Sequence, residues 1–179
     1  GGRVYTGADD GNIYCLNANT GEKIWTAYAG GLFKYIIMPQ MLQSRSSPII
    51  VGDSLYVGAL DGKVYCLNTA NGAVRWTYAT SDAIGGSPAY SNGVIYIAST
   101  DTYLYALDAA TGAFKWKSIP LNLDVYYVGN GAMSNLNYFC TPTPVIAGGT
   151  VYVAGGVTMG GLSHNVTKYR WLTNLVGPG

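Results

Sequence analysis

The sequence predicts an all-β fold, a β-propeller made of four-stranded antiparallel blades. Two observations predict it: one phrase recurs along the chain at a nearly fixed period, and each copy has the pattern of four short strands. Tryptophans mark the period, because Trp25, Trp76 and Trp116 lie 51 and 40 residues apart. No segment longer than about ten residues carries the apolar period of a helix, which argues against an α-solenoid.

The second copy shows the strands of one blade in order. An apolar run is followed by a Gly-Asp turn and then by alternating β-forming residues. Asp61-Gly62 predicts a hairpin, because both residues tolerate positive φ. After the next strand, Asn71-Gly72 turns the chain again, and the last strand carries Trp76. The four strands are expected at residues 47–51, 54–59, 63–68 and 73–78.

About four blades are expected within one domain, residues 1–179. Their approximate bounds are 3–45, 46–84, 85–140 and 141–176. The fourth copy keeps a Thr143-Pro144 start and Trp171, but residues 155–167 lack the turn signals of the other copies. About four blades would leave open strand edges, which invite further pairing. We therefore expect either a piece of a longer protein or self-association through the open blade edges.

The repeats resemble those of pyrroloquinoline-quinone-type β-propellers, the superfamily of quinoprotein dehydrogenases and outer-membrane assembly lipoproteins. The motif runs from a small residue, through Asn or Asp two positions later and Thr-Gly, to a tryptophan ten positions after its start. It matches from Cys15 to Trp25, from Cys66 to Trp76 (with Asn71 in place of Thr) and from Ala106 to Trp116. The resemblance covers about residues 3–154. It implies a partial ring, part of a seven- or eight-bladed propeller.

Each residue of this tryptophan-docking motif has a structural role. A flat indole on the outer strand can lie between adjacent blades and bury a large apolar area. The Asn or Asp side chain can bond the backbone of the turn, and Gly supplies positive φ. Cys15, Cys66 and Ala106 share one position, which indicates a slot for a small apolar residue, and a Cys15–Cys66 disulfide is not expected.

The composition indicates an extracytoplasmic location: secreted, periplasmic or cell surface. Charged residues make up 11% of the chain and the net charge is +1, so the chain lacks the excess of positive charge that is typical of nucleic-acid-binding proteins. Tyrosine occurs 16 times among many Gly, Asn, Ser and Thr residues, as in secreted and envelope β-proteins. No stretch is long enough to span a bilayer. Asn165 begins one candidate glycosylation sequon.

Two long insertions are the candidate binding elements. They cover residues 29–45 and 118–140, and strand arithmetic places them on the same face as the Asp-Gly hairpins. Both carry Tyr, Asn and Gln, which suit a protein or glycan surface. The alternative is that they only cover the rim or pack on a neighbouring blade. The candidate contacts are Tyr35, Gln40, Arg45, Tyr126, Tyr127 and Asn130.

Catalytic residues, a metal site and a cofactor are not expected. His164 is the only histidine, and the carboxylates mostly lie in hairpins and in the docking motif. Two classes of function remain. The first is a non-catalytic scaffold or envelope module that binds a protein or glycan partner. The alternative is a fragment of a pyrroloquinoline-quinone-dependent dehydrogenase. The resemblance implies that such an enzyme needs a calcium held by Glu and Asn, and Glu22 is the only glutamate here.

Overall fold

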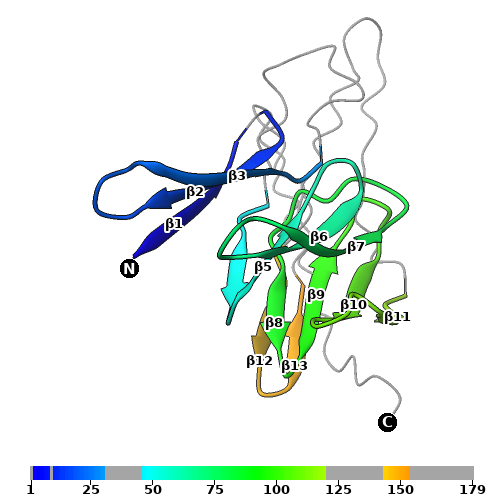
Figure 1. Cartoon of the computed structure of the whole chain (residues 1–179). Coiled ribbons are helices and arrows are strands. Elements are labelled where there is room, and N and C mark those ends of the chain that lie inside the picture. Colours follow the sequence, from blue (N-terminus) through cyan, green and yellow to red (C-terminus); the bar gives the residue numbers. More distant parts are fainter. Residues whose placement is uncertain (1, 9, 31–45, 120–142, 154–179) are drawn as a thin grey trace, which may run out of the picture.

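The computed structural model describes residues 2–8, 10–30, 46–119 and 143–153, and these form antiparallel β-sheets without a helix (Figure 1). We number the sheets 1 to 4 along the chain. Sheet 1 contains β1 (Arg3–Gly7), β2 (Asn12–Asn17) and β3 (Lys23–Tyr28), and sheet 2 contains β4 (Ile49–Val51), β5 (Ser54–Gly58), β6 (Lys63–Asn68) and β7 (Val74–Ala79). Sheet 3 contains β8 (Ala89–Ser91), β9 (Val94–Ala98), β10 (Leu104–Asp108) and β11 (Phe114–Lys117), and sheet 4 contains β12 (Val145–Ala147) and β13 (Thr150–Tyr152).

Neighbouring strands in each sheet are also consecutive in the chain, so each sheet is an up-and-down meander. This order confirms the expected four-stranded antiparallel blades. The observed β6 has the expected bounds, whereas β4 begins two residues after the expected start. Pro48 has no N–H for a ladder, and the Ser47 N–H donates to Ser87 Oγ at 2.8 Å instead.

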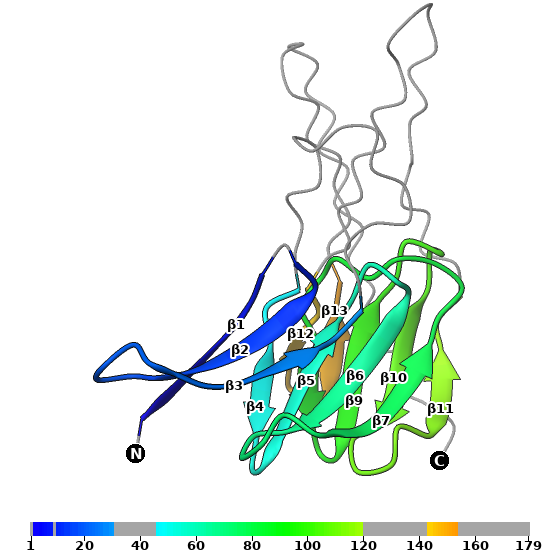
Figure 2. The same cartoon turned by 45° about the horizontal axis from the view of Figure 1, so that its top comes forward.

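The sheets lie side by side (Figure 2). Apolar side chains pack between them in three clusters. Sheet 2 is buried on both faces: Leu55 and Leu67 belong to the core shared with sheet 1, whereas Val64 and Cys66 belong to the core shared with sheet 3. Alternate side chains of a strand point to opposite faces, so one sheet can serve two cores. Leu104 and Val151 belong to a third core, between sheets 3 and 4.

A small residue lies directly opposite the tryptophan in each repeat. The strand pairs are Cys15 with Trp25, Cys66 with Trp76, and Ala106 with Trp116. A register shift follows the small residue in all three sheets, at Cys15/Leu16, Cys66/Leu67 and Ala106/Leu107. Cys15 and Cys66 are buried free thiols. The small residue is therefore the cross-strand neighbour of the tryptophan.

The tryptophans of sheets 1 and 2 reach across to the next sheet. Trp25 Nε1 donates to the Thr69 carbonyl at 3.0 Å, and Trp76 Nε1 donates to the Ala109 carbonyl at 3.0 Å. A tyrosine beside each indole donates to the same carbonyl: Tyr5 to Thr69 at 3.2 Å and Tyr56 to Ala109 at 3.0 Å. The Ala109 carbonyl thus accepts two hydrogen bonds from the preceding sheet, and the Thr69 carbonyl accepts a third from Arg3 Nη1 at 2.7 Å. These bonds fix how neighbouring sheets align.

Hairpins join the second and third strands of the repeats, as predicted. The hairpin predicted at Asp61-Gly62 is observed; Gly62 has φ of 81°, whereas Asp61 does not have positive φ, so only the glycine of the pair uses the region that both residues tolerate. The Gly62 N–H donates to the Ala59 carbonyl at 3.1 Å, and Gly62 ends a longer loop, as in three-residue hairpins. The Asp61 carboxylate instead accepts the Lys63 N–H at 3.0 Å.

Replacing Thr102 with glycine is expected to raise the free energy of unfolding by about 1 kcal/mol. Thr102 has φ of 79° at the position where the other two repeats have Gly11 and Gly62, each with φ of 81°. A β-branched residue is strained in this region, and glycine is not. Urea unfolding followed by tryptophan fluorescence measures the change. The control is Thr77→Gly, at an exposed position inside β7, which should lower stability; a loss in both variants would contradict the prediction.

Candidate binding face

One end of the sheets carries the hairpins that join β1 to β2, β5 to β6 and β9 to β10, and we call this end the hairpin face. The connection from β7 to β8 also lies here, because the Ile84 N–H donates to the Ala59 carbonyl at 3.0 Å and the Thr100 N–H donates to the Ala83 carbonyl at 2.9 Å. These contacts agree with the strand arithmetic that places both kinds of connection on one face.

The described residues that flank the two long insertions are also attached to the hairpin face. Ala29 donates its N–H to the Gly11 carbonyl at 3.0 Å, and Ser118 donates its N–H to the Leu104 carbonyl at 2.9 Å. At the other ends, Ser46 Oγ accepts the Gly58 N–H at 2.9 Å and Thr143 Oγ1 accepts the Ser87 N–H at 3.1 Å. All four flanking residues are thus held by neighbours at the hairpin face or at the starts of inner strands.

The candidate contacts themselves lie outside the described residues. This holds for Tyr35, Gln40, Arg45, Tyr126, Tyr127 and Asn130, and also for the candidate glycosylation residue Asn165. Their assignment stays a prediction, and the described residues supply only the frame around them.

Serine and threonine side chains link the starts of the inner strands. The Ser47 N–H donates to Ser87 Oγ at 2.8 Å, and the Ser87 N–H donates to Thr143 Oγ1 at 3.1 Å. The three residues hold the same place before β4, β8 and β12, so one bond is repeated from sheet to sheet. This ladder fixes the inner strands beside the hairpin face.

A carboxylate–tyrosine pair in each hairpin was not predicted from the sequence. Tyr14, Tyr65 and Tyr105 donate their hydroxyls to Asp10, Asp61 and Asp101 at 2.5, 2.7 and 2.6 Å, respectively. The other oxygen of each carboxylate accepts a backbone N–H two residues further on. The spacing Asp-x-x-x-Tyr recurs in all three copies and was the available signal. These carboxylates therefore hold the hairpins in shape.

Tyrosine ionisation should make the fold sensitive to alkali. Burial raises the pKa of Tyr65 and Tyr105 above the ordinary value of about 10, and the hydrogen bonds to Asp61 and Asp101 raise it further. The folded state therefore holds these protons more tightly than the unfolded chain does. The resulting stability is complete below about pH 10 and is lost as the pH rises above that value.

We expect the free energy of unfolding in urea to be lower at about pH 11 than at about pH 8. A Tyr65→Phe/Tyr105→Phe variant keeps both rings but cannot ionise at these positions. Its free energy of unfolding should fall less between the two pH values than that of the parent chain. An equal fall in variant and parent would show that other groups cause the alkaline loss.

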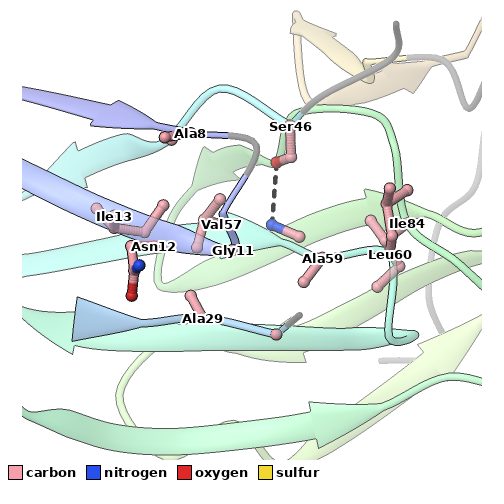
Figure 3. Close-up of a pocket in the computed structure, with 13 residues that line it drawn as sticks. Ala8, Gly11, Asn12, Ile13, Ala29, Ser46, Val57, Ala59, Leu60 and Ile84 are labelled. Carbon is pink, nitrogen blue, oxygen red and sulfur yellow. Dashed lines mark hydrogen bonds between the residues drawn. The ribbon is translucent and has the colours of Figure 1, made fainter. Parts of the chain in front are cut away.

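A small apolar recess opens between sheets 1 and 2 at the hairpin face (Figure 3). Between sheets 2 and 3 the equivalent space is filled by Ile84, because a Cβ on Gly58 would lie 2.2 Å from Ile84 Cγ2. A Cβ on Gly7, the equivalent residue of β1, would meet nothing closer than Ile13 Cδ1 at 3.6 Å. The recess offers apolar contact, and none of the described residues that line it is charged. It is lined by Ala8, Ile13, Ala29, Val57, Ala59 and Leu60, among others.

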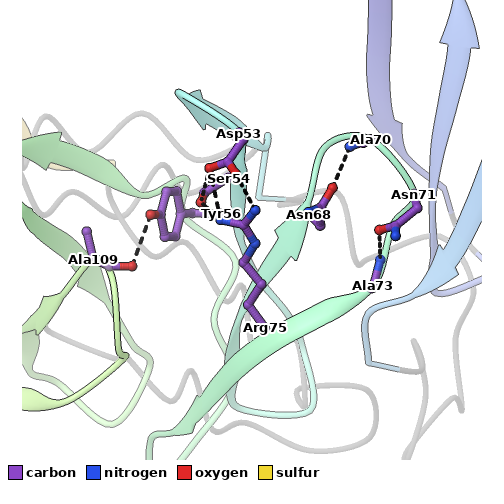
Figure 4. Close-up of polar contacts among 9 residues, drawn as sticks. All are labelled: Asp53, Ser54, Tyr56, Asn68, Ala70, Asn71, Ala73, Arg75 and Ala109. Atoms are coloured by element: carbon purple, nitrogen blue, oxygen red, sulfur yellow. Dashed lines mark hydrogen bonds and ion pairs between the residues drawn. The ribbon is translucent and has the colours of Figure 1, made fainter.

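At the opposite end of the sheets, polar contacts join strand ends and cap a turn (Figure 4). Arg75 Nη1 donates to Asp53 Oδ1 at 2.9 Å and to Ser54 Oγ at 2.7 Å. The Arg75 guanidinium lowers the pKa of the Asp53 carboxyl through this hydrogen bond and its charge. Asn68 Oδ1 accepts the Ala70 N–H at 2.7 Å, which caps the turn that receives Trp25.

Two features are absent from the residues that the structure describes. Among them, no three His, Cys, Asp or Glu residues gather in an arrangement that could hold a metal ion. The same residues contain no helix of the length and apolar character needed to cross a membrane.

Two curated proteins are similar to parts of this chain. The chain is 29% identical over 90 residues to the outer membrane protein assembly factor BamB of Salmonella typhimurium, covering 50% of this chain and 23% of the relative. It is 26% identical over 118 residues to a tetrathionate hydrolase of Acidithiobacillus ferrooxidans, covering 51% of this chain and 21% of the relative. The chain thus spans only about a fifth of the length of these curated relatives.

Solved structures give the same fold. BamB from Moraxella catarrhalis matches with a TM-score of 0.56 at 22% identity, over 84% of this chain and 39% of that one. A quinohemoprotein alcohol dehydrogenase from Pseudomonas putida matches with a TM-score of 0.60 at 20% identity, over 87% of this chain and 27% of that one. At these identities the matches show the β-propeller fold alone.

A family model shows the family. The model described as outer membrane protein assembly factor BamB matches residues 9–173, which is most of the chain. The match extends across the three copies of the tryptophan motif and the fourth, less regular copy. The resemblance to pyrroloquinoline-quinone-type propellers is confirmed, and this chain belongs to the family described as outer membrane protein assembly factor BamB.

Proposed function

We propose that this chain is a non-catalytic propeller scaffold of the cell envelope that binds a protein partner outside the cytoplasm. The observation that carries the proposal is the family match over residues 9–173, because the family is described by a role in outer membrane protein assembly. Curated relatives of that name occur in Salmonella typhimurium and Yersinia pestis. A glycan would be the other class of ligand suited to the same loops, and Asn165 remains a candidate glycosylation residue.

The hairpin face is the proposed binding surface. Its described carboxylates, Asp10, Asp61 and Asp101, bond tyrosines and turn backbone and so hold the hairpins in shape. This structural role supports a non-catalytic face. The residues flanking both long insertions are attached to the same end of the sheets. Loops carried on such a rigid frame are a common place for binding residues. Tyr35, Gln40, Arg45, Tyr126, Tyr127 and Asn130 are the proposed contacts.

The test uses a Tyr126→Ala/Tyr127→Ala variant of the full chain. A partner is first captured from an envelope fraction and identified by mass spectrometry, and its Kd is then measured with purified components. The double variant should weaken binding at least about tenfold, since tyrosines are common energetic anchors in interfaces. Its free energy of unfolding should change by about 0.5 kcal/mol or less if both rings are exposed.

Phe114→Ala is the matched control, because Phe114 is an exposed aromatic residue at the opposite end of sheet 3. This control should leave the Kd unchanged. Unchanged affinity in the Tyr126→Ala/Tyr127→Ala variant, or its unfolding, would refute the assignment of these tyrosines to the binding surface.

A fragment of a quinone-dependent dehydrogenase is the second candidate. One observation favours it: a quinohemoprotein alcohol dehydrogenase from Comamonas testosteroni matches with a TM-score of 0.52 at 25% identity, over 65% of this chain and 19% of that one. Adding pyrroloquinoline quinone with calcium, and then an alcohol or an aldose, separates the two candidates. We expect no dye reduction. Turnover would reverse the order of the two functions.

A further inference from the structure

Two Asn-Gly pairs lie in turns of the described chain. Asn71-Gly72 lies between β6 and β7, and Asn92-Gly93 lies between β8 and β9. In such a pair the backbone nitrogen of the glycine can attack the side-chain amide carbon of the asparagine, because glycine has no Cβ to obstruct the approach. The reaction replaces the amide by a carboxyl group and is called deamidation. A third pair, Asn130-Gly131, lies outside the described residues.

The turn at Asn71-Gly72 engages both groups that would have to react. Asn71 Oδ1 accepts the Ala73 N–H at 3.0 Å (Figure 4). The Gly72 N–H donates to the Asn68 carbonyl at 2.8 Å. Gly72 is also closely packed, because a Cβ there would lie 2.7 Å from Trp25 Cε3. The amide carbon and the glycine nitrogen can therefore meet only when this turn opens locally.

The turn at Asn92-Gly93 differs at both groups. Asn92 is exposed with φ of 48°, and Gly93 has φ of 77°, so both φ angles are positive, as in two-residue type I′ hairpin loops. Within the described part of the chain, the Asn92 side chain and the Gly93 N–H have no hydrogen-bond partner. A Cβ on Gly93 would have nothing within 4 Å. No contact has to break before these two groups approach each other.

We propose that Asn92 is a site of spontaneous deamidation in the folded chain, whereas Asn71 is protected by its turn. The Gly93 nitrogen loses its proton to solvent base and forms a bond to Asn92 Cγ. The bond from Cγ to the amide nitrogen breaks, and this nitrogen takes a proton from water and leaves as ammonia. Water then opens the cyclic imide. Opening at the side-chain carbonyl gives aspartate, and opening at the main-chain carbonyl gives isoaspartate.

Isoaspartate at residue 92 would disturb the contact between sheets 2 and 3. The Gly93 carbonyl accepts the Ala109 N–H at 2.8 Å. The Ala109 carbonyl in turn accepts Trp76 Nε1–H and the Tyr56 hydroxyl, each at 3.0 Å. Isoaspartate adds one atom to the main chain of a two-residue turn, so Gly93 would no longer hold Ala109 in this position. Aspartate adds no atom and tolerates positive φ, so it should leave the turn intact.

The test compares the rates at the two asparagines within one molecule. The 179-residue chain is incubated in mildly alkaline buffer, and peptide mapping by mass spectrometry follows deamidation at each residue. In the folded chain Asn92 should react at least about tenfold faster than Asn71. In urea both turns are lost, so the two rates should become similar. Equal rates in the folded chain, a faster Asn71, or an unchanged ratio in urea would overturn the proposal.

Two variants test the structural consequence. Asn92→Gly removes the reactive amide and keeps the turn, because Gly52 holds this place in the preceding repeat with φ of 59°. Asn71→Thr is the matched control, because Thr20 and Thr111 hold that place in the other repeats and their hydroxyls accept the corresponding backbone N–H. Incubation should lower the urea midpoint of the parent chain and of Asn71→Thr more than that of Asn92→Gly. An equal decline in all three would refute the effect of isoaspartate on the sheet contact.

Discussion

Replacing Trp76 with alanine should lower the free energy of unfolding by about 3 to 5 kcal/mol. Trp76 is 9% exposed, packs between sheets 2 and 3, and donates Nε1–H to the Ala109 carbonyl at 3.0 Å. Its ring centroid lies 5.8 Å from that of Tyr56. The variant would lose apolar burial and a hydrogen bond, and it would leave a cavity between two blades.

Urea unfolding followed by the remaining tryptophans measures this loss. Trp76→Phe separates its two sources, since phenylalanine keeps much of the apolar ring but cannot donate a hydrogen bond, and it should cost less than Trp76→Ala. Val74→Ala, at a 52% exposed position on the same strand, is the control and should change stability little. A loss below about 1 kcal/mol for Trp76→Ala would mean that the indole does not join the blades.

Replacing Gly112 with alanine should cost about 2 to 5 kcal/mol. Two effects add. The residue has φ of 74°, which costs an L side chain about 1 to 2 kcal/mol. The new Cβ would also lie 2.6 Å from Trp76 Cδ2 and Cε3, so the indole would have to move away from the turn at residues 108–112.

Gly93→Ala separates these two effects. Gly93 has φ of 77° but open space around it, so its variant should show only the backbone cost. The difference between the two variants measures the clash with the indole. The clash should also disappear in a Trp76→Ala background, because the side chain that blocks the new Cβ is gone. Equal losses for Gly112→Ala and Gly93→Ala would contradict a close contact between Gly112 and the Trp76 indole.

Local sequence determined the blades because strand and turn signals act over a few residues. The alternation from Lys63 to Asn68 and the glycines at 72 and 112 placed strands and turns where they are observed. The Asp61-Gly62 hairpin was also located correctly, but the role of the Asp61 side chain was not predicted. The Asp61 side chain bonds Lys63 and Tyr65, and that choice depends on a tyrosine on the adjoining strand.

Local sequence patterns do not predict the positions of the candidate contacts. Tyr126 and Tyr127 lie in a long insertion with no counterpart after β7, so the repeat gives no template for their positions. The repeat does give templates for the residues around them, which is why Ser47, Ser87 and Thr143 form a regular ladder.

The sequence by itself determined the all-β fold, the four-stranded blades and the repeat family, because these depend on periodic residue patterns that each copy carries. Only the tertiary structure decided which equivalent residues have partners. Gly21 and Gly72 have nearly the same φ and occupy the same turn of the repeat, yet one faces open space and the other faces Trp25. The physical reason is that the tryptophan that packs on such a turn comes from the neighbouring sheet, and the local sequence of the turn does not contain that neighbour.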